Sequence, residues 1–97
     1  MRSLWTRHAL ERLAEIEEFI ALDAPERAAE FAHELMDQVD RLEHHPDLGR
    51  SVPEDAENLR RELIHQGYRI IYRVDANQIY VLSVFEGSRL VRPEDLK

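Results

Sequence analysis

The sequence predicts an α+β fold with the order β-α-α-β-β-β, in which an antiparallel helical hairpin packs on one face of a mostly antiparallel sheet. Two patterns predict it: apolar residues recur at helical spacing through residues 7–42, and they alternate with polar ones through residues 59–75. The third observation is the length of 97 residues, which suits one hydrophobic core and is too short for two. We therefore expect one domain spanning residues 1–97.

The first helix is expected to run from Thr6, which can cap its N-terminus, to about Leu22. One apolar stripe lies along it, made of Ala9, Leu13, Ile16 and Ile20. Before Thr6, the alternation of Ser3 and Trp5 with Leu4 favours a short strand.

A second helix is predicted to begin directly after the first. Asp23 is the expected N-cap, Pro25 lies in the first turn, and Glu26 would complete a capping box. The apolar stripe consists of Ala28, Phe31, Leu35, Val39 and Leu42. His45 should end the helix because it precedes a proline. So short a connection implies two antiparallel helices whose stripes face one layer.

The segment 46–58 is predicted to be a loop, because proline, glycine and acidic residues are frequent in it. After it, alternation over residues 59–64 predicts a strand, and Gln66-Gly67 supplies a hairpin turn. A second alternating strand follows over residues 68–75.

The chain should turn again at Asp75-Ala76-Asn77. Residues 78–85 are apolar on both faces, as expected of an interior strand. Residues 86–97 are predicted to be a loop and a polar tail.

Alternation in the strand 68–75 predicts which side chains face the helices: Tyr68, Ile70, Tyr72 and Val74. Arg69 and Arg73 then lie on the opposite, open face, where Arg60 of the neighbouring strand can join them. That face is the expected place for recognition or chemistry.

Charge and composition exclude several classes of protein. The chain has 13 Lys plus Arg against 20 Asp plus Glu, a net charge of −7. Residues 1–58 carry −9 and residues 59–97 carry +2. This balance argues against broad nucleic-acid affinity, so we expect no direct DNA binding by the chain alone and acidic partners for the strand face.

The sequence contains no cysteine, which excludes disulfides, thiolate zinc sites and cysteine nucleophiles. The longest uncharged apolar run, residues 79–85, is too short to span a bilayer, and the start of the chain lacks a signal-peptide pattern. We expect a cytoplasmic protein with no membrane partner.

Metal and cofactor sites are not predicted. His44 and His45 are adjacent at a helix end and point in different directions, and no histidine–carboxylate spacing resembles a metal site. Glu15 and Glu18 fall on the outer face of their helix, where solvation explains them. We therefore predict no metal and no cofactor.

Taken together, the motifs resemble the RelE/ParE superfamily of bacterial toxins, and more closely its ParE branch, a plasmid stabilisation family. The resemblance covers nearly the whole chain. It is carried by residues 19–28 at the helix junction, Pro46-Asp47-Leu48-Gly49-Arg50, Arg61-Glu62-Leu63, residues 67–74 (GYRIIYRV), and residues 79–85 (IYVLSVF) followed by Arg89.

RelE-like members of this superfamily are ribosome-dependent endoribonucleases that cleave mRNA with a cluster of basic residues and a tyrosine. Arg69 matches the arginine of that cluster, and Arg60 could replace a lysine. Glu62 stands where a second lysine would be wanted, and Gly87 lies near the place of a second phosphate-binding arginine. No tyrosine follows Tyr80. Because a carboxylate opposes an anionic transition state, these departures weaken the nuclease interpretation.

ParE-like members lack the catalytic cluster and resemble inhibitors of DNA gyrase that a ParD-like antitoxin binds and neutralises. The resemblance thus favours a type II toxin, inhibiting gyrase without a catalytic site of its own. An mRNA endonuclease, and a non-toxic relative that only binds its antitoxin, remain alternatives. The candidate strand face for target or antitoxin consists of Arg60, Arg69, Arg73, Phe85 and Arg89. The candidate helical docking face consists of Phe19, Leu22 and Met36.

Overall fold

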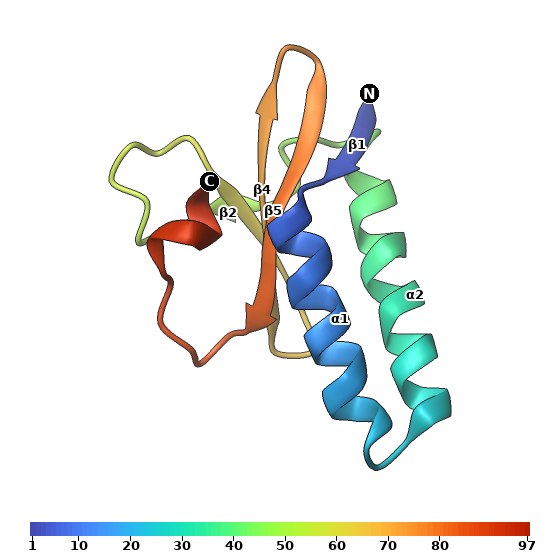
Figure 1. Cartoon of the computed structure of the whole chain (residues 1–97). Coiled ribbons are helices and arrows are strands. Elements are labelled where there is room, and N and C mark those ends of the chain that lie inside the picture. The colour runs from blue at the N-terminus through green and yellow to red at the C-terminus, as the bar shows by residue number, and fades with distance from the viewer.

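The computed structural model describes residues 1–97 and has two helices packed on one face of a five-stranded sheet (Figure 1). The elements are β1 (Arg2–Trp5), α1 (Arg7–Ala21), α2 (Pro25–Leu42), β2 (Arg50–Ser51), β3 (Arg61–His65), β4 (Tyr68–Asp75), β5 (Gln78–Glu86) and the 3-10 helix η1 (Pro93–Leu96). The strand order is β1-β5-β4-β3-β2, with β1 parallel to β5 and the other pairs antiparallel. The predicted α+β fold is confirmed.

One strand was not expected. Arg50 and Ser51 form β2 within the segment predicted to be a loop, and they pair with Glu62 and Arg61 of β3. Local turn residues dominate the sequence there, whereas the pairing depends on β3, which lies ten residues further along the chain.

The caps of the helices follow the sequence in part. Thr6 accepts a hydrogen bond from the backbone N–H of Ala9 at 3.1 Å, as expected of an N-cap. The predicted capping box at α2 is wrong, because Ala24 is the N-cap and no side chain caps the helix. Asp23 instead belongs to the turn that closes α1, where its N–H donates to the carbonyl of Ile20 at 3.2 Å.

The predicted end of α2 at His45 is also three residues too late. The helix ends at Leu42, and the N–H groups of His44 and His45 both donate to the carbonyl of Arg41. The bond of His44 spans three residues and tightens the end of the helix, whereas that of His45 still spans four, as in an α-helix.

Both predicted hairpin turns are present, with two positive-φ residues each. Gln66 and Gly67 have φ of 49° and 83°, and Ala76 and Asn77 have φ of 50° and 64°. Positive φ at both central residues is the conformation that matches the twist of two antiparallel strands.

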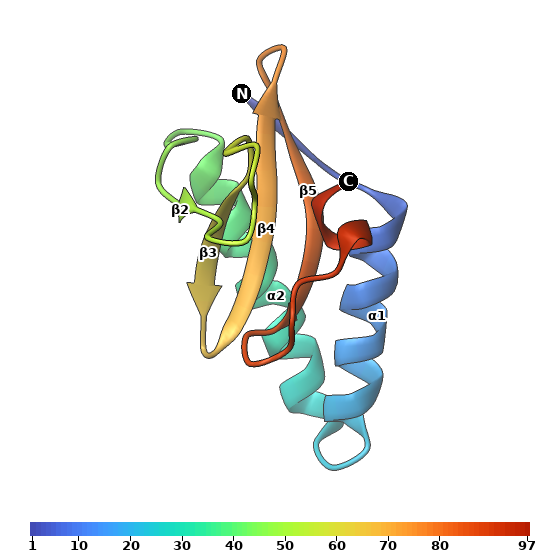
Figure 2. The ribbon, with the colours of Figure 1, turned by 90° about the vertical axis from the view of Figure 1, so that its left-hand side faces the viewer.

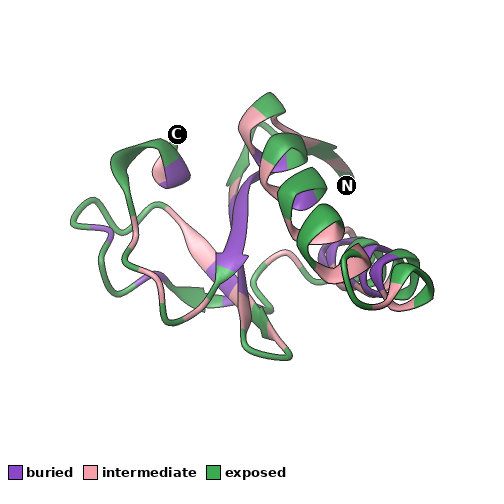
Figure 3. Cartoon of the chain, turned by 60° about the horizontal axis from the view of Figure 1, so that its bottom comes forward, coloured by how far each residue is buried: buried purple, intermediate pink, exposed green.

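Most of the core lies between the helices and the sheet, and Figure 3 shows the buried residues of both helices on their inner sides. This cluster consists of Ala9, Leu13, Phe31, Ala32, Leu35, Val39, Ile70, Val81 and Val84. Tyr68 and Ile70 face the helices as predicted, and Tyr72 packs against Leu42 of α2. Val74 is exposed instead, because it lies near the tip of the β4–β5 hairpin, which extends past the helices (Figure 1).

The opposite face of the sheet is also covered, where the sequence predicted an open face. Val52, Ile71, Leu82 and Phe85 form a second buried cluster, against which Leu96 of the C-terminal segment packs. Figure 2 shows the segment after β2 and the C-terminal segment on this side of the sheet. An irregularity in the β4–β5 register at Ile71 and Tyr72 explains why Val81 and Val84, three residues apart, face the same side.

Neither helix is long and apolar enough to cross a membrane.

Candidate functional site

Arg69 of β4 is the centre of an ion-pair cluster on the face opposite the helices. Its Nε donates to Glu62 at 2.6 Å, and its Nη1 and Nη2 donate to the two carboxylate oxygens of Glu54 at 2.9 and 2.7 Å. Arg50 donates from Nε to the other oxygen of Glu62 at 2.7 Å. We call Arg50, Glu54, Glu62 and Arg69 the Arg69 cluster; its formal charges cancel.

The strands place three members of the cluster. Arg50 is directly opposite Glu62 in the β2–β3 register, and Arg69 is opposite Ile64 in the β3–β4 register. Glu62 is therefore the diagonal neighbour of Arg69 on one face of the sheet. The side chain of Glu62 is fully buried, and that of Arg69 is only 8% exposed. Hydrogen bonds to Glu54 and Glu62 raise the pKa of Arg69 above its usual range, so its guanidinium is always charged.

The fourth member, Glu54, comes from the segment between β2 and β3. Val52 is buried in the second core cluster, and Asp55 accepts hydrogen bonds from the backbone N–H groups of Glu57, Leu59 and Arg60. Anchors on both sides of Glu54 thus fix its backbone. Hydrogen bonds from Arg69 lower the pKa of Glu54 below its usual range.

Two arginines of the predicted strand face lie outside this cluster. Arg60 donates to Asp55 at 3.2 Å and to Glu57 at 2.6 Å, within its own loop. Arg73 donates to Asp75 at 3.0 Å, and its guanidinium carbon lies 4.5 Å from the Tyr80 ring centre. Arg60 also donates from Nε to the carbonyl oxygen of Leu96 at 2.8 Å, and neither Arg60 nor Arg73 bonds to a member of the Arg69 cluster.

Phe85 and Arg89 do lie beside Arg69. Phe85 is opposite Arg69 in the β4–β5 register, and its ring centre is 5.5 Å from the guanidinium carbon of Arg69 and 4.1 Å from that of Arg89. The aromatic ring therefore connects the Arg69 cluster to the C-terminal segment.

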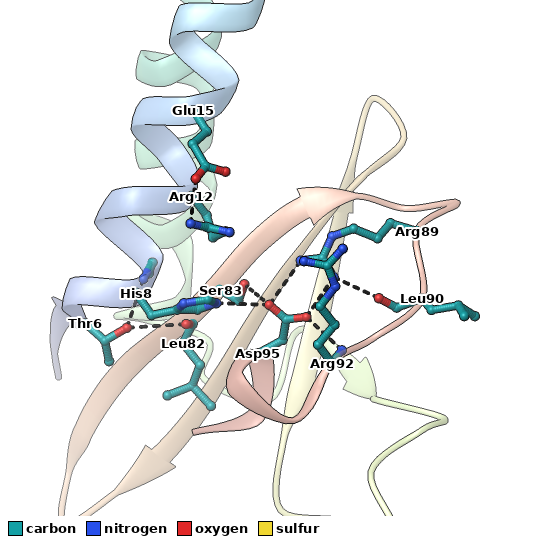
Figure 4. Close-up of polar contacts among 11 residues, drawn as sticks. Thr6, His8, Arg12, Glu15, Leu82, Ser83, Arg89, Leu90, Arg92 and Asp95 are labelled. Atoms are coloured by element: carbon teal, nitrogen blue, oxygen red, sulfur yellow. Dashed lines mark hydrogen bonds and ion pairs between the residues drawn. The ribbon is translucent and has the colours of Figure 1, made fainter.

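Asp95 holds that segment in place and was missed by the sequence reasoning, which assigned it to a polar tail (Figure 4). Its fully buried carboxylate accepts hydrogen bonds from Ser83 Oγ at 2.7 Å, the Arg92 N–H at 2.9 Å and two Arg89 nitrogens at 3.0 and 3.1 Å. His8 Nε2 of α1 lies 3.0 Å away. Burial alone would raise the pKa of Asp95, but these donors, Arg89 foremost, hold it well below its usual range.

One residue of the sequence indicates a helical turn in this segment: Pro93, because proline is typical of the first position of such a turn. The 3-10 helix that it begins replaces the predicted irregular tail and turns the Asp95 side chain inward. Nothing local indicates the distant donors on α1 and β5.

A groove of about 420 Å³ runs between α1 and the end of β5. Its apolar lining consists of Ile16, Phe19, Tyr68, Val84 and Phe85. Its charged lining consists of Arg12, Glu15, Glu86, Arg89 and Arg92. We call this the α1–β5 groove; Figure 4 shows Arg12 and Glu15 on α1 and Arg89 on the segment after β5. The buried Nε of Arg12 has no hydrogen-bond partner.

The groove brings together residues from the candidate strand face and from the candidate helical docking face. Phe19, which is 71% exposed, joins Phe85 and Arg89 in its lining. Leu22 is 82% exposed near the tip of the helical hairpin, and Met36 is exposed on α2, and neither of them lines the groove. The groove thus presents an exposed aromatic residue together with three arginines and two glutamates.

No group of three or more potential metal ligands comes together. His8 contacts Asp95, and His65 lies 2.8 Å from Glu34 in a separate ion-pair group.

A helical hairpin on one face of a five-stranded, mostly antiparallel sheet defines a small α+β protein. The family described as ParE toxin of type II toxin-antitoxin system, parDE, matches residues 4–91, and the chain belongs to that family. Its fold is similar to a solved structure of the chromosomal ParDE TA system from P. aeruginosa, with a TM-score of 0.77 and 24% sequence identity. That match covers 89% of this chain and 95% of the other. No curated protein matches the sequence.

Proposed function

We propose that this member of the ParE toxin family inhibits DNA gyrase by direct contact, without a catalytic site of its own, and that a ParD-like antitoxin neutralises it. One observation carries the choice of an inhibitor over a nuclease. Arg69, the residue that matches the phosphate-binding arginine of RelE-like nucleases, is bonded to two carboxylates. The proposal includes a cytoplasmic location, because the target acts on chromosomal DNA.

Charge explains why this arrangement opposes RNA cleavage. A phosphorane transition state needs several converging cations and groups that accept and donate protons. Around Arg69 the two arginines are matched by two glutamates, and Glu62 is fully buried and bonded on both oxygens. A phosphate at Arg69 would lie beside that fixed negative charge, so binding of the transition state would be disfavoured.

The α1–β5 groove supports the antitoxin part of the proposal. Phe19 offers a large exposed apolar surface, and in the charged lining Arg12, Arg89 and Arg92 outnumber Glu15 and Glu86. An amphipathic antitoxin segment could bury its apolar residues against Phe19 and direct its carboxylates to the arginines. The antitoxin interface predicted from sequence at Leu22 and Met36 would extend this contact along the helical hairpin.

The test of the target is a pair of assays on the purified protein. DNA supercoiling by gyrase should fall as the protein is added, whereas ribosome-dependent mRNA cleavage should be absent at the same concentrations. Unimpaired supercoiling together with cleaved codons would establish the nuclease instead. Unimpaired supercoiling without mRNA cleavage, together with intact antitoxin binding, would identify a non-toxic relative that only binds its antitoxin.

The test of the antitoxin surface is a pair of substitutions on α1. Phe19→Ala should weaken binding of a ParD-like antitoxin at least about tenfold, or about 1.4 kcal/mol, because a large exposed anchor is lost. Leu10→Ala is the matched control, since Leu10 is also exposed on α1 but does not line the groove. Equal affinities of the two variants, measured by calorimetry, would place the antitoxin elsewhere.

A further inference from the structure

The two carboxylates bonded to Arg69 differ in how freely they can leave it. Glu62 belongs to β3, is fully buried and is also held by Arg50. The side chain of Glu54 is 43% exposed, and Arg69 is its hydrogen-bond partner. Because Val52 and Asp55 anchor the backbone on either side, Glu54 can leave Arg69 by rotating its side chain alone.

A recess of about 310 Å³ opens at this point of the surface. Arg50, Glu54 and Arg69 line it together with Gly67 and Gly87. A Cβ at Gly87 would lie 2.7 Å from the carbonyl oxygen of Gly67 and 3.4 Å from Cγ of Arg69, so a side chain cannot be added there without moving the backbone. Gly87 therefore lets the chain pass close to the aliphatic part of the Arg69 side chain.

We propose that Glu54 occupies a binding site for a carboxylate of a partner protein, and that an acidic side chain of the partner displaces Glu54 and takes Nη1 and Nη2 of Arg69. The site is specific for planar anions, because the guanidinium presents two parallel donors that a carboxylate matches with two hydrogen bonds. This recognition deepens the proposed protein-binding function but can be tested without either gyrase or an antitoxin.

Charge favours an acidic protein segment over a nucleic acid at this site. When Glu54 turns away, Arg50, Arg69 and Glu62 together carry one positive charge, which one carboxylate neutralises. A nucleic acid would bring further phosphates to a chain with a net charge of −7 and close to the buried Glu62. Repeated negative charge is therefore disfavoured where a single carboxylate is accepted.

Glu54 competes with an incoming ligand for Arg69, and this competition lowers the affinity of the ligand. A ligand that needs Glu54 to leave binds with its intrinsic affinity multiplied by the fraction of molecules in which Glu54 has left. If Glu54 occupies Arg69 in about nine molecules of ten, its removal should strengthen binding about tenfold. Arg69 stays paired with Glu62 in such a variant, so the fold is retained.

The experiment titrates the peptide acetyl-Leu-Glu-Leu-amide into ¹⁵N-labelled protein and follows the Nε–H signal of Arg69 by NMR. Glu54→Ala should bind the peptide about tenfold more tightly than the original chain, and acetyl-Leu-Gln-Leu-amide should not bind. Glu57→Ala is the matched control, because it removes the same charge from the same loop, where Glu57 pairs with Arg60 instead. The control should bind like the original chain.

Three results would overturn the proposal. Equal strengthening in Glu54→Ala and Glu57→Ala would mean that net charge alone governs binding. No strengthening in Glu54→Ala would mean that Glu54 does not compete for the site. Tighter binding of an oligouridylate than of the acidic peptide to Glu54→Ala would assign the site to nucleic acid.

Discussion

Replacing Asp95 by alanine tests how much one buried carboxylate contributes to holding the C-terminal segment, which the Arg60–Leu96 hydrogen bond and the packing of Leu96 also hold. Ser83, which is fully buried, and the N–H of Arg92 lose their acceptor, at a cost of about 1–2 kcal/mol each. Arg89 and His8 are partly exposed and can turn to water, so losing the Arg89 ion pair and the His8 contact costs less than about 1 kcal/mol. Asp95→Ala should therefore lower the free energy of unfolding by about 3 kcal/mol.

The assay is urea and thermal unfolding followed by circular dichroism at pH 7. For a domain of this size, a loss of about 3 kcal/mol corresponds to a decrease in Tm of about 12–24 °C. Glu94→Ala is the control, because Glu94 is the exposed neighbour and should change stability by less than about 0.5 kcal/mol. A loss below about 1 kcal/mol in Asp95→Ala would refute the view that this carboxylate fixes the segment.

The same carboxylate should make stability depend on pH. Because the folded pKa of Asp95 lies well below its ordinary value of 3.8, its contribution is complete above about pH 5 and is lost as pH falls through the folded pKa. Asp95→Ala should lack this part of the acid destabilisation. An unchanged pH profile in the variant would contradict the assignment.

Other substitutions test the remaining polar contacts. Glu62→Ala should lower the free energy of unfolding by about 3–5 kcal/mol, since it leaves the buried Arg69 Nε unpaired; a loss below about 1 kcal/mol in urea unfolding would refute this. Thr6→Ala should cost about 1 kcal/mol through the lost N-cap, and an unchanged Tm would contradict the role of the cap. Hydrogen bonds from Arg27, and then from His65, lower the pKa of Glu34 to about 2, so stability should decrease as pH falls from about 5 towards 2. Glu34→Gln should reduce that decrease, and an identical acid profile would disprove the pairing.

Patterns within single elements predicted the fold. Thr6 lies where a cap is needed, and the apolar stripes of both helices face the core as their spacing predicts. The hairpin turn at Gln66-Gly67 was equally visible, because positive φ is needed at both positions and glycine adopts it readily. Each of these features depends on residues close together in the chain, so a short stretch of sequence is enough to predict it.

The candidate site was only partly visible, because its contacts join distant segments. Alternation correctly placed Arg69 opposite the helices, but its partner Glu54 is 15 residues away along the chain. Asp95 and His8 are 87 residues apart, and no local pattern signals their contact. Arg60 could have been assigned better, since Glu57 precedes it by three residues and forms a local ion pair.

The central claim is that this ParE family member inhibits gyrase by contact and that a ParD-like antitoxin neutralises it. The most direct measurement is a supercoiling assay in which gyrase is first inhibited by the purified protein and a ParD-like antitoxin is then added. We predict that supercoiling stops and is restored at a stoichiometric amount of antitoxin. Supercoiling that continues at saturating protein would contradict the claim.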